Sequence, residues 1–207
     1  MSGPGYLHQR LIVGYHGCDR EVARRVLMDG EDLVASANPY DWLGNGVYFW
    51  EHGFTRAHQF AEEKRGRGEI TDPFVIGAYV HLGNCLDLTD LWATQLLARD
   101  FKRLRSGARR RGHALPKNKK ARAAGSDVLL RYLDCAVINY CLERSEKRGH
   151  YDTVRGVFEE GAPAYEGAAI REKSHVQVAV RNPACILGYF RPKGYPGEIG
   201  DVSRAQA

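Results

Sequence analysis

Two short apolar runs on either side of a helix-like segment constrain the fold of this chain more than any other feature. Residues 11–17 are apolar and β-branched until His16, where we expect a strand to give way to a turn. Residues 43–50 include two glycines around Asn45, typical of a tight turn that feeds a strand. Side chains alternate between the two faces of a strand, so Tyr48 is predicted to face the same cleft as His16.

The segment between these runs is predicted to be a helix that closes one side of the cleft. Asp19 can cap its N-terminus, and Val22, Val26 and Leu27 recur at the spacing of one helix face. Gly30 follows as a stop signal. The early part of the chain therefore indicates a strand, a helix and a second strand around one cleft.

The length and composition of the chain indicate one globular domain. Its 207 residues, 43% of them hydrophobic, suffice for one α+β domain with a substantial core, with loose ends at 1–9 and 193–207. No apolar run approaches the length of a membrane span and no signal-peptide pattern is present, so we expect a cytoplasmic protein without membrane contacts. Scattered cysteines without metal-ligand spacing predict buried, reduced thiols and no metal site: Cys18, Cys85, Cys135, Cys141 and Cys185.

Positive charge is concentrated in one stretch of the sequence. From Arg99 to Arg122 eleven Lys or Arg face one acid, a net charge of +10, whereas the rest of the chain carries −5. Residues 106–125 have few large apolar side chains and are predicted to form an exposed, mobile loop. This charge favours a polyanion as partner, while a solvated loop or an acidic protein partner stays open. The candidate nucleic-acid contacts are Arg105, Arg109, Arg110, Arg111, Lys117, Lys119 and Lys120.

The remaining elements are predicted from hydrophobic periodicity and turn signals. We expect a helix over 55–64, a hairpin of strands 74–82 and 85–88 around Gly83-Asn84, and a helix that starts at Thr89 or Asp90. A further helix from Ser126 or Asp127 through Cys141, a strand over 152–158, a polar loop over 159–174 and strands over 175–180 and 185–190 complete the prediction.

The two apolar runs resemble the nicotinamide pocket of ADP-ribosyltransferases of the His-Tyr-Glu class. This class includes the diphtheria-type toxins, the poly(ADP-ribose) polymerases and bacterial enzymes that modify nucleic acid. The resemblance rests on His16-Gly17 after an apolar strand, Gly30 at a helix end and the sequence Gly-Asn-Gly-Val-Tyr-Phe over 44–49. It implies an ADP-ribosyltransferase-like fold, in which split mixed or antiparallel sheets flanked by helices surround an NAD cleft.

The resemblance also implies roles for individual residues toward NAD+ as substrate. His16 would hold the nicotinamide ribose, the backbone of Gly17 would contact the carboxamide, and Tyr48 would lie against the nicotinamide ring. Phe60 is the nearest aromatic residue for the second face of that ring, although the sequence favours a core position for it. Loops between pocket strands often touch the ligand, which makes Ser36, Asn38 and Tyr40 candidate NAD contacts.

The third catalytic residue of the class sits early in a strand that follows the acceptor loop, and Gln177 takes this place where the class has Glu. His175 shares its strand face, and Glu172, Glu160 and Glu166 are acids in the preceding loop. Glutamine can hydrogen-bond a ribose hydroxyl but brings no charge and is a poor base. Three outcomes stay open: single transfer to an intrinsically nucleophilic acceptor, which we favour, compensation by another acid, or loss of activity.

We therefore expect transfer of one ADP-ribose from NAD+ to a macromolecular acceptor, first of all RNA or DNA, by a bacterial toxin or defence effector. An acidic antitoxin or regulator protein stays open as a further partner. One alternative is mono-ADP-ribosylation of a protein. A second is an NAD-dependent RNA 2′-phosphotransferase, a class that binds phosphate through additional Arg and His residues, of which this sequence offers only Arg10, Arg56 and Arg181. A third is an inactive module that binds a ligand or nucleic acid.

Overall fold

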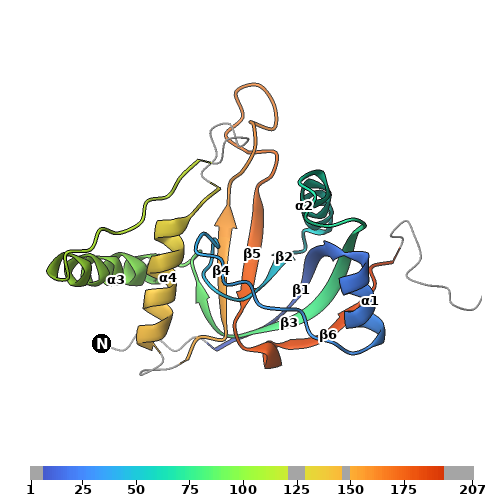
Figure 1. Cartoon of the computed structure of the whole chain (residues 1–207), viewed down its shortest axis with the longest axis horizontal. Helices are drawn as coiled ribbons and strands as arrows, with labels where there is room; N and C mark the ends of the chain where they lie inside the picture. The colour runs from blue at the N-terminus through green and yellow to red at the C-terminus, as the bar shows by residue number, and fades with distance from the viewer. Residues whose placement is uncertain (1–6, 121–128, 146–149, 194–207) are drawn as a thin grey trace, which may run out of the picture.

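The computed structural model describes residues 7–120, 129–145 and 150–193, which form a mixed six-stranded sheet with four helices (Figure 1). This combination agrees with the α+β class expected from the sequence. The strands are β1 (Leu7–Asp19), β2 (Val47–Glu51), β3 (Pro73–Asp87), β4 (Thr153–Phe158), β5 (His175–Val180) and β6 (Ile186–Phe190). The helices are α1 (Arg20–Met28), α2 (Phe54–Gly66), α3 (Leu91–Arg110) and α4 (Tyr132–Ser145), and the 3₁₀ helix η1 (Pro183–Cys185) precedes β6.

The strand order is β1-β2-β5-β4-β3-β6, and β1 also pairs with β3. The pairs are antiparallel except for β3 with β4, which is parallel. Because β1 pairs with both β2 and β3, five strands follow one another in a closed ring of pairings, to which β6 adds on the far side of β3. The long β3 thus belongs to two groups of strands, with β1 and β6 along its first part and β4 at its end.

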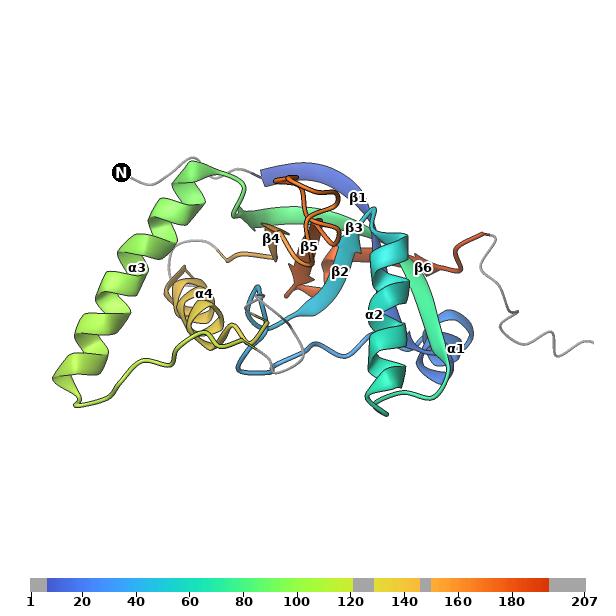
Figure 2. The same ribbon diagram turned by 90° about the horizontal axis from the view of Figure 1, so that it is seen from above.

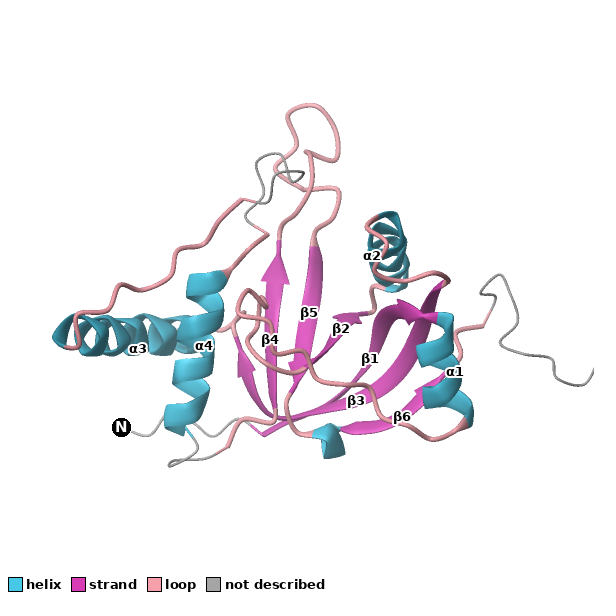
Figure 3. Ribbon diagram, viewed as in Figure 1, coloured by secondary structure: helices cyan, strands magenta, loops and turns pink. Residues whose placement is uncertain are grey.

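The helices lie at the two ends of the sheet (Figures 1 and 3). At one end α1 and α2 contribute Ala23, Val26 and Ala57 to a core that contains Phe49 and Phe74 of the strands. At the other end α3 and α4 pack together against β4, in a second core built from Ala93, Ile138, Cys141, Leu142, Val154 and Phe158. Seen from above, α2 lies alongside the group of β1, β2 and β3, well away from α3 and α4 (Figure 2).

Several predicted element ends are confirmed. Asp19 caps α1 by accepting a hydrogen bond from the Glu21 N–H, and Asp90 caps α3 by accepting one from the Trp92 N–H.

All five cysteines are buried and unpaired, as the sequence predicted. None of the helices within the described residues is long and apolar enough to cross a membrane. The predicted loose ends are wrong for 7–9, which belong to β1, and the parts at 1–6 and 194–207 lie outside the described residues.

The predicted hairpin at Gly83-Asn84 is wrong, because residues 73–87 form the single strand β3. Gly83 has a positive φ of 58°, but the chain continues past it in the same direction. Residues that pair with both edges of β3 around Gly83 favour a continuous strand over a hairpin. The first residues of β1 pair with Gly83 and Asn84, and the Asp152 carboxylate before β4 accepts a hydrogen bond from the Asn84 N–H at 2.8 Å.

The predicted loop over 106–125 is wrong at its start, because α3 continues to Arg110. Arginine and alanine have high helix propensities, which outweigh the low helix propensity of the single Gly107 in this segment. The chain after α3 is exposed, but Asn118 ties it to α4 by accepting a hydrogen bond from the Leu133 N–H at 2.8 Å and donating one to the Asp134 carboxylate. Helix α4 begins at Tyr132, later than predicted, while 121–128 lie outside the described residues.

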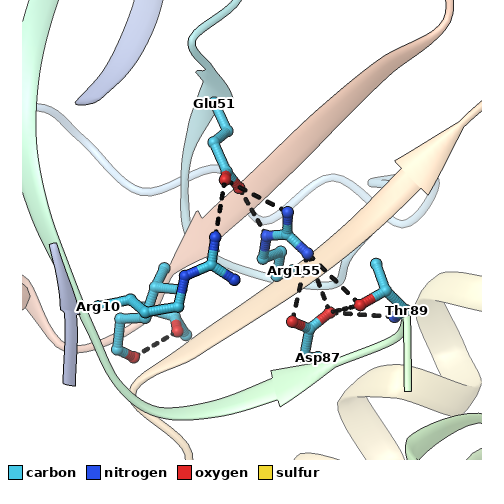
Figure 4. Close-up of polar contacts among 7 residues, drawn as sticks. Arg10, Glu51, Asp87, Thr89 and Arg155 are labelled. Atoms are coloured by element: carbon cyan, nitrogen blue, oxygen red, sulfur yellow. Dashed lines mark hydrogen bonds and ion pairs between the residues drawn. The ribbon is translucent and has the colours of Figure 1, made fainter. Parts of the chain in front are cut away.

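A buried ion cluster joins the ends of three strands (Figure 4). Arg155 of β4 donates to the Glu51 carboxylate at 2.6 Å and lies 3.2 Å from Asp87 Oδ2, and the three side chains are between 7% and 11% exposed. Burial acts to raise the pKa of Asp87, yet hydrogen bonds from Thr89 and the Arg155 charge lower it. Arg10 adds a longer contact of 3.8 Å to Glu51 from a side chain that is 55% exposed. Arg155 therefore compensates two carboxylates that water does not reach.

Replacing Arg155 by methionine is expected to lower the free energy of unfolding by about 3–5 kcal/mol, because it leaves two buried carboxylates without their partner. Arg10→Met is the control, since it removes the exposed cation of the same cluster and should cost about 1 kcal/mol or less. Urea unfolding of both variants measures the difference. Equal losses would contradict this account of the cluster.

Candidate functional site

A cavity of about 670 Å³ lies against β2 and α2 and is bounded by segments far apart in the sequence. Seven of the residues predicted from the sequence line it. They are His16, Ser36, Asn38, Tyr40, Tyr48, Phe60 and Gln177. The predicted cleft residues thus meet in one place, which is large enough for a ligand of nucleotide size.

His16 lies near the end of β1, where the pairing with β2 stops. Its Nδ1 is 2.8 Å from the carbonyl oxygen of Tyr48. A carbonyl can only accept, so Nδ1 carries the proton and Nε2 keeps its lone pair. Burial lowers the pKa of His16 to about 4, against the opposing effect of the Tyr48 hydrogen bond. At neutral pH this imidazole is therefore uncharged and presents an acceptor, which suits a hydroxyl group.

The hydroxyl of Tyr48 holds the turn that precedes β2. It accepts a hydrogen bond from the Leu43 N–H at 2.8 Å and donates one to the Gly44 carbonyl at 2.6 Å. Burial raises the pKa of this phenol, so it stays protonated. Because the hydroxyl is engaged with the backbone, the ring of Tyr48 is the part left to contact a ligand in the cavity.

Gln177 reaches the cavity through the register of β5. It lies opposite Trp50 of β2, and both side chains line the cavity. The Gln177 side chain is buried, and its amide makes no hydrogen bond to another residue in the described ranges. An uncharged amide therefore stands at the wall of the cavity with its hydrogen-bonding groups available to a ligand.

One face of α2 contributes an aromatic ring and two cations. Phe60 packs on Trp50 with ring centroids 5.0 Å apart, Lys64 Nζ lies 5.3 Å from the Phe60 ring, and Arg67 Cζ lies 5.9 Å from it. All four residues line the cavity. The sequence analysis missed Trp50, Lys64 and Arg67, although the spacing of Phe60, Lys64 and Arg67 at i, i+4 and i+7 is that of one helix face.

A buried ion pair forms another part of the wall. Arg56 Nη2 donates to both oxygens of Glu160, at 3.1 and 2.9 Å, and the side chains are 11% and 8% exposed. Of the loop acids that the sequence offered, Glu160 lines the cavity, whereas Glu166 and Glu172 are exposed and do not line it. The charged lining consists of Asp41, Glu63, Glu69 and Glu160 against Arg56, Lys64 and Arg67.

Besides the exposed Glu172, two of the predicted catalytic or NAD-binding residues do not line the cavity, Gly17 and His175. Gly17 faces α2, where a Cβ would collide with the carbonyl oxygen of Ala57, so a backbone contact of Gly17 with a ligand stays a prediction. His175 lies behind the wall, 4.0 Å from Glu160, and its Nδ1 donates to the Lys173 carbonyl at 2.6 Å. Burial lowers the pKa of His175.

The basic residues divide into two groups at different distances from the cavity. Arg105, Arg109 and Arg110 lie exposed on α3, followed by Arg111, at the side of the molecule away from α2 (Figure 2). By contrast, Lys119 pairs through its backbone with Leu130, which lines the cavity. The exposed Lys117 and Lys120 flank this second group. The basic segment thus extends from the outer end of α3 to the edge of the cavity.

Comparison with known proteins adds one relative. An uncharacterized protein of Methanocaldococcus jannaschii is 26% identical to this chain over 191 residues, which cover 83% of each sequence. No model of a known protein family matches the chain. The similarity extends over most of both proteins, and because the relative is uncharacterized it does not indicate an activity for this chain.

The low pKa of His16 predicts a pH dependence of stability. The unfolded chain takes up a proton near pH 6.5, whereas the folded protein holds the pKa of this group near 4. His16 should therefore leave the free energy of unfolding unchanged above pH 6.5 and lower it as pH falls from 6.5 toward 4, by at most about 1.4 kcal/mol per pH unit.

Urea unfolding of the native protein and of His16→Asn across this pH range isolates the effect, because asparagine retains an N–H donor and does not titrate. The difference between the two proteins is expected to be flat above pH 6.5 and to change below it, with the native protein losing stability. A difference that stays constant down to pH 4 would contradict the buried neutral state of His16.

Proposed function

We propose that this protein has an ADP-ribosyltransferase-like fold and transfers one ADP-ribose group from NAD+ to a nucleic-acid acceptor. The observation that carries the proposal is the convergence of His16, Tyr48, Phe60 and Gln177 on one cavity, from β1, β2, α2 and β5. Each of these side chains has the chemistry that its role requires. A function as a toxin or defence effector under the control of an antitoxin stays a prediction, as does a cytoplasmic location.

The nicotinamide ring would lie against Tyr48 and Phe60. Both rings line the cavity, and the Tyr48 hydroxyl is held by the Leu43 and Gly44 backbone, which fixes the plane of its ring. Aromatic rings attract one another in offset or edge-to-face arrangements beyond the effect of their buried area. Two fixed rings would orient the leaving group before the bond to ribose breaks.

The nicotinamide ribose would bind between His16 and Gln177. Nε2 of the neutral imidazole accepts a hydrogen bond from a ribose hydroxyl, and the Gln177 amide offers both a donor and an acceptor. When the bond to nicotinamide breaks, the sugar becomes positively charged, and groups that favour this charge lower the barrier. Gln177 supplies orientation but no negative charge, so the site must obtain that charge from another residue.

The pyrophosphate of NAD+ would meet the cations at the end of α2. Lys64 lines the cavity and makes no ion pair with another described residue, and Arg67, one helical turn further, is paired with Glu69. A phosphate binds to such a point charge without any change in the fold. This would place the dinucleotide along α2, with its nicotinamide toward β5.

The acceptor is proposed from the charge of α3 and the segment that follows it. The lysines and arginines from Arg99 to Lys120 are exposed, and this segment approaches the cavity at Lys119, which pairs with Leu130. Polyanions bind such surfaces by releasing counterions. The RNA 2′-phosphotransferase alternative has weaker support, because of its three arginines only Arg56 lines the cavity and Glu160 neutralises that charge. The labelling experiment below also detects transfer of ADP-ribose to a protein.

Incubation of the protein with NAD+ labelled in its adenylate phosphate, together with separate pools of RNA, DNA and protein, tests the proposal. Label is expected to become attached to RNA or DNA as a single ADP-ribose, with release of one nicotinamide. Label on the protein pool alone would identify a protein as the acceptor in place of nucleic acid. Release of phosphate from a 2′-phosphorylated RNA would favour the phosphotransferase. No consumption of NAD+ in any pool would contradict the enzymatic proposal.

Substitutions of Tyr48 separate the role of its ring from that of its hydroxyl. Tyr48→Ala is expected to lower kcat/KM for NAD+ by at least about 100-fold, because it removes the ring. Tyr48→Phe keeps the ring and loses hydrogen bonds to the turn, so its kcat/KM should fall by about tenfold or less. Steady-state release of nicotinamide measures both, and circular dichroism checks the fold. Equal losses in the two variants would contradict a stacking role for the ring.

Neutralising Arg109, Arg110 and Arg111 together to glutamine is expected to raise the acceptor KM with little change in kcat. The dependence of log KM on log salt should flatten by about 0.7–0.9 for each phosphate contact that is lost. Arg20→Gln, Arg24→Gln and Arg25→Gln together on α1, at the opposite end of the sheet, remove the same three charges and serve as the control for net charge. An unchanged salt dependence in the triple variant would remove α3 from the acceptor surface.

A further inference from the structure

Four buried polar side chains form a connected cluster at the wall of the cavity beside Gln177. They come from β2, α2, the loop after β4 and the start of β5. Arg56 lies over the Trp50 ring at 5.7 Å and donates to Glu160 at 2.9 Å, and His175 lies 4.0 Å from Glu160. Trp50, Arg56 and Glu160 line the cavity, with His175 directly behind them.

Hydrogen bonding within this cluster is incomplete. Trp50 Nε1, Arg56 Nε and Nη1, and His175 Nε2 are buried and have no hydrogen-bond partner among the described residues. Buried polar atoms in proteins are nearly always hydrogen-bonded. This incomplete hydrogen bonding beside a cavity is the kind of site where water or a polar group of a bound molecule supplies the remaining partners.

Glu160 stands close to the place where the reaction proposed above would occur. His175 and Gln177 are two residues apart on one face of β5, which separates them by about 7 Å. The Glu160 carboxylate lies 4.0 Å from His175, and Glu160 lines the same cavity as His16, Tyr48 and Gln177. A carboxylate, held by Arg56, is therefore present in the cavity to which Gln177 brings no charge.

We propose that Glu160 is the catalytic base for the acceptor, an assignment that rests on the proposed transfer of ADP-ribose. In this step the bond between the nicotinamide nitrogen and the ribose C1′ breaks, and its electron pair leaves with nicotinamide. The acceptor oxygen or nitrogen forms the new bond to C1′ and gives its proton to the Glu160 carboxylate. Arg56 holds this carboxylate in place through its Nη2, while its Nη1 lies 3.8 Å from Glu63.

The charges of the wall favour an acceptor that reacts at a hydroxyl or amine rather than at a phosphate. Near Gln177 the Arg56 charge is balanced by Glu160, and Glu63 on the same helix face is paired with Lys173 at 3.0 Å. A phosphate dianion would add two negative charges beside these carboxylates, whereas a neutral hydroxyl or amine adds none. A hydroxyl or amine acceptor must lose a proton as it forms the new bond, and a nearby base can take up that proton.

Glu160→Gln provides the main test, because glutamine keeps the size of the side chain and an oxygen that accepts from Arg56. We expect kcat for transfer to fall by about 10²–10⁴-fold, as for loss of a general base, with the NAD+ Kd from calorimetry changed by less than about threefold. Glu159→Gln, at the exposed neighbouring position, is the matched control and should behave like the native protein. Native kcat in Glu160→Gln would overturn the assignment.

Two further variants keep the test decisive if Glu160→Gln folds poorly. Glu160→Asp keeps the charge and withdraws the carboxylate by one methylene, so it should fold normally and lose at least about tenfold in kcat. The double variant Glu160→Gln with Gln177→Glu restores a carboxylate next to the lost one and is expected to recover at least about tenfold over Glu160→Gln. Native kcat in the aspartate variant, or no recovery in a folded double variant, would overturn the assignment.

The acceptor class is tested with oligonucleotides that carry or lack terminal phosphates. Modification that is independent of these phosphates supports a hydroxyl or amine acceptor, and a strict requirement for them overturns it. A native protein that neither binds nor consumes NAD+ would instead refute the proposed function, and the assignment of Glu160 with it. A protein that consumes NAD+ at the native rate without Glu160 would refute the assignment alone.

Discussion

The hydrogen bond between His16 Nδ1 and the Tyr48 carbonyl joins β1 and β2 at the point where their pairing ends. It fixes which imidazole nitrogen carries the proton, and burial keeps the ring neutral. Because the donor is committed to the backbone, the remaining nitrogen is an acceptor for the cavity. The position of β2 against β1 and β5 therefore determines both the geometry of the site and its chemistry.

In the proposed reaction, the groups that would hold the nicotinamide and its ribose differ from the group that would take up the proton. The former are aromatic or uncharged and sit on regular elements: His16 and Gln177 on strands, Tyr48 beside a turn closed by its own hydroxyl, and Phe60 on a helix. The carboxylate near them, Glu160, comes from a loop and is held by Arg56 of α2. Rigid elements position catalytic groups better than free loops do, and the buried ion pair gives this loop residue a comparable anchor.

The sequence predicted the elements whose signals are local, and it missed those set by distant partners. Asp19 and Asp90 cap helices as expected, because a cap depends on a few neighbouring residues. The continuous course of β3 through Gly83 depends on pairing with β1 and on Asp152, which no local pattern reveals. In the same way the strand positions of His16 and Tyr48 were visible, whereas the sequence could not single out Glu160 among the loop acids it named, because the contact with Arg56 that places Glu160 at the cavity spans 104 residues.

The central claim is that the nicotinamide end of NAD+ binds where β1, β2 and β5 meet. A crystal structure of the protein with NAD+ tests it most directly. The account predicts the nicotinamide ring between Tyr48 and Phe60, with a ribose hydroxyl hydrogen-bonded to His16 Nε2 and the Gln177 amide within reach of the same sugar. Electron density for the dinucleotide at any other surface, or a cavity that stays empty at saturating NAD+, would contradict it.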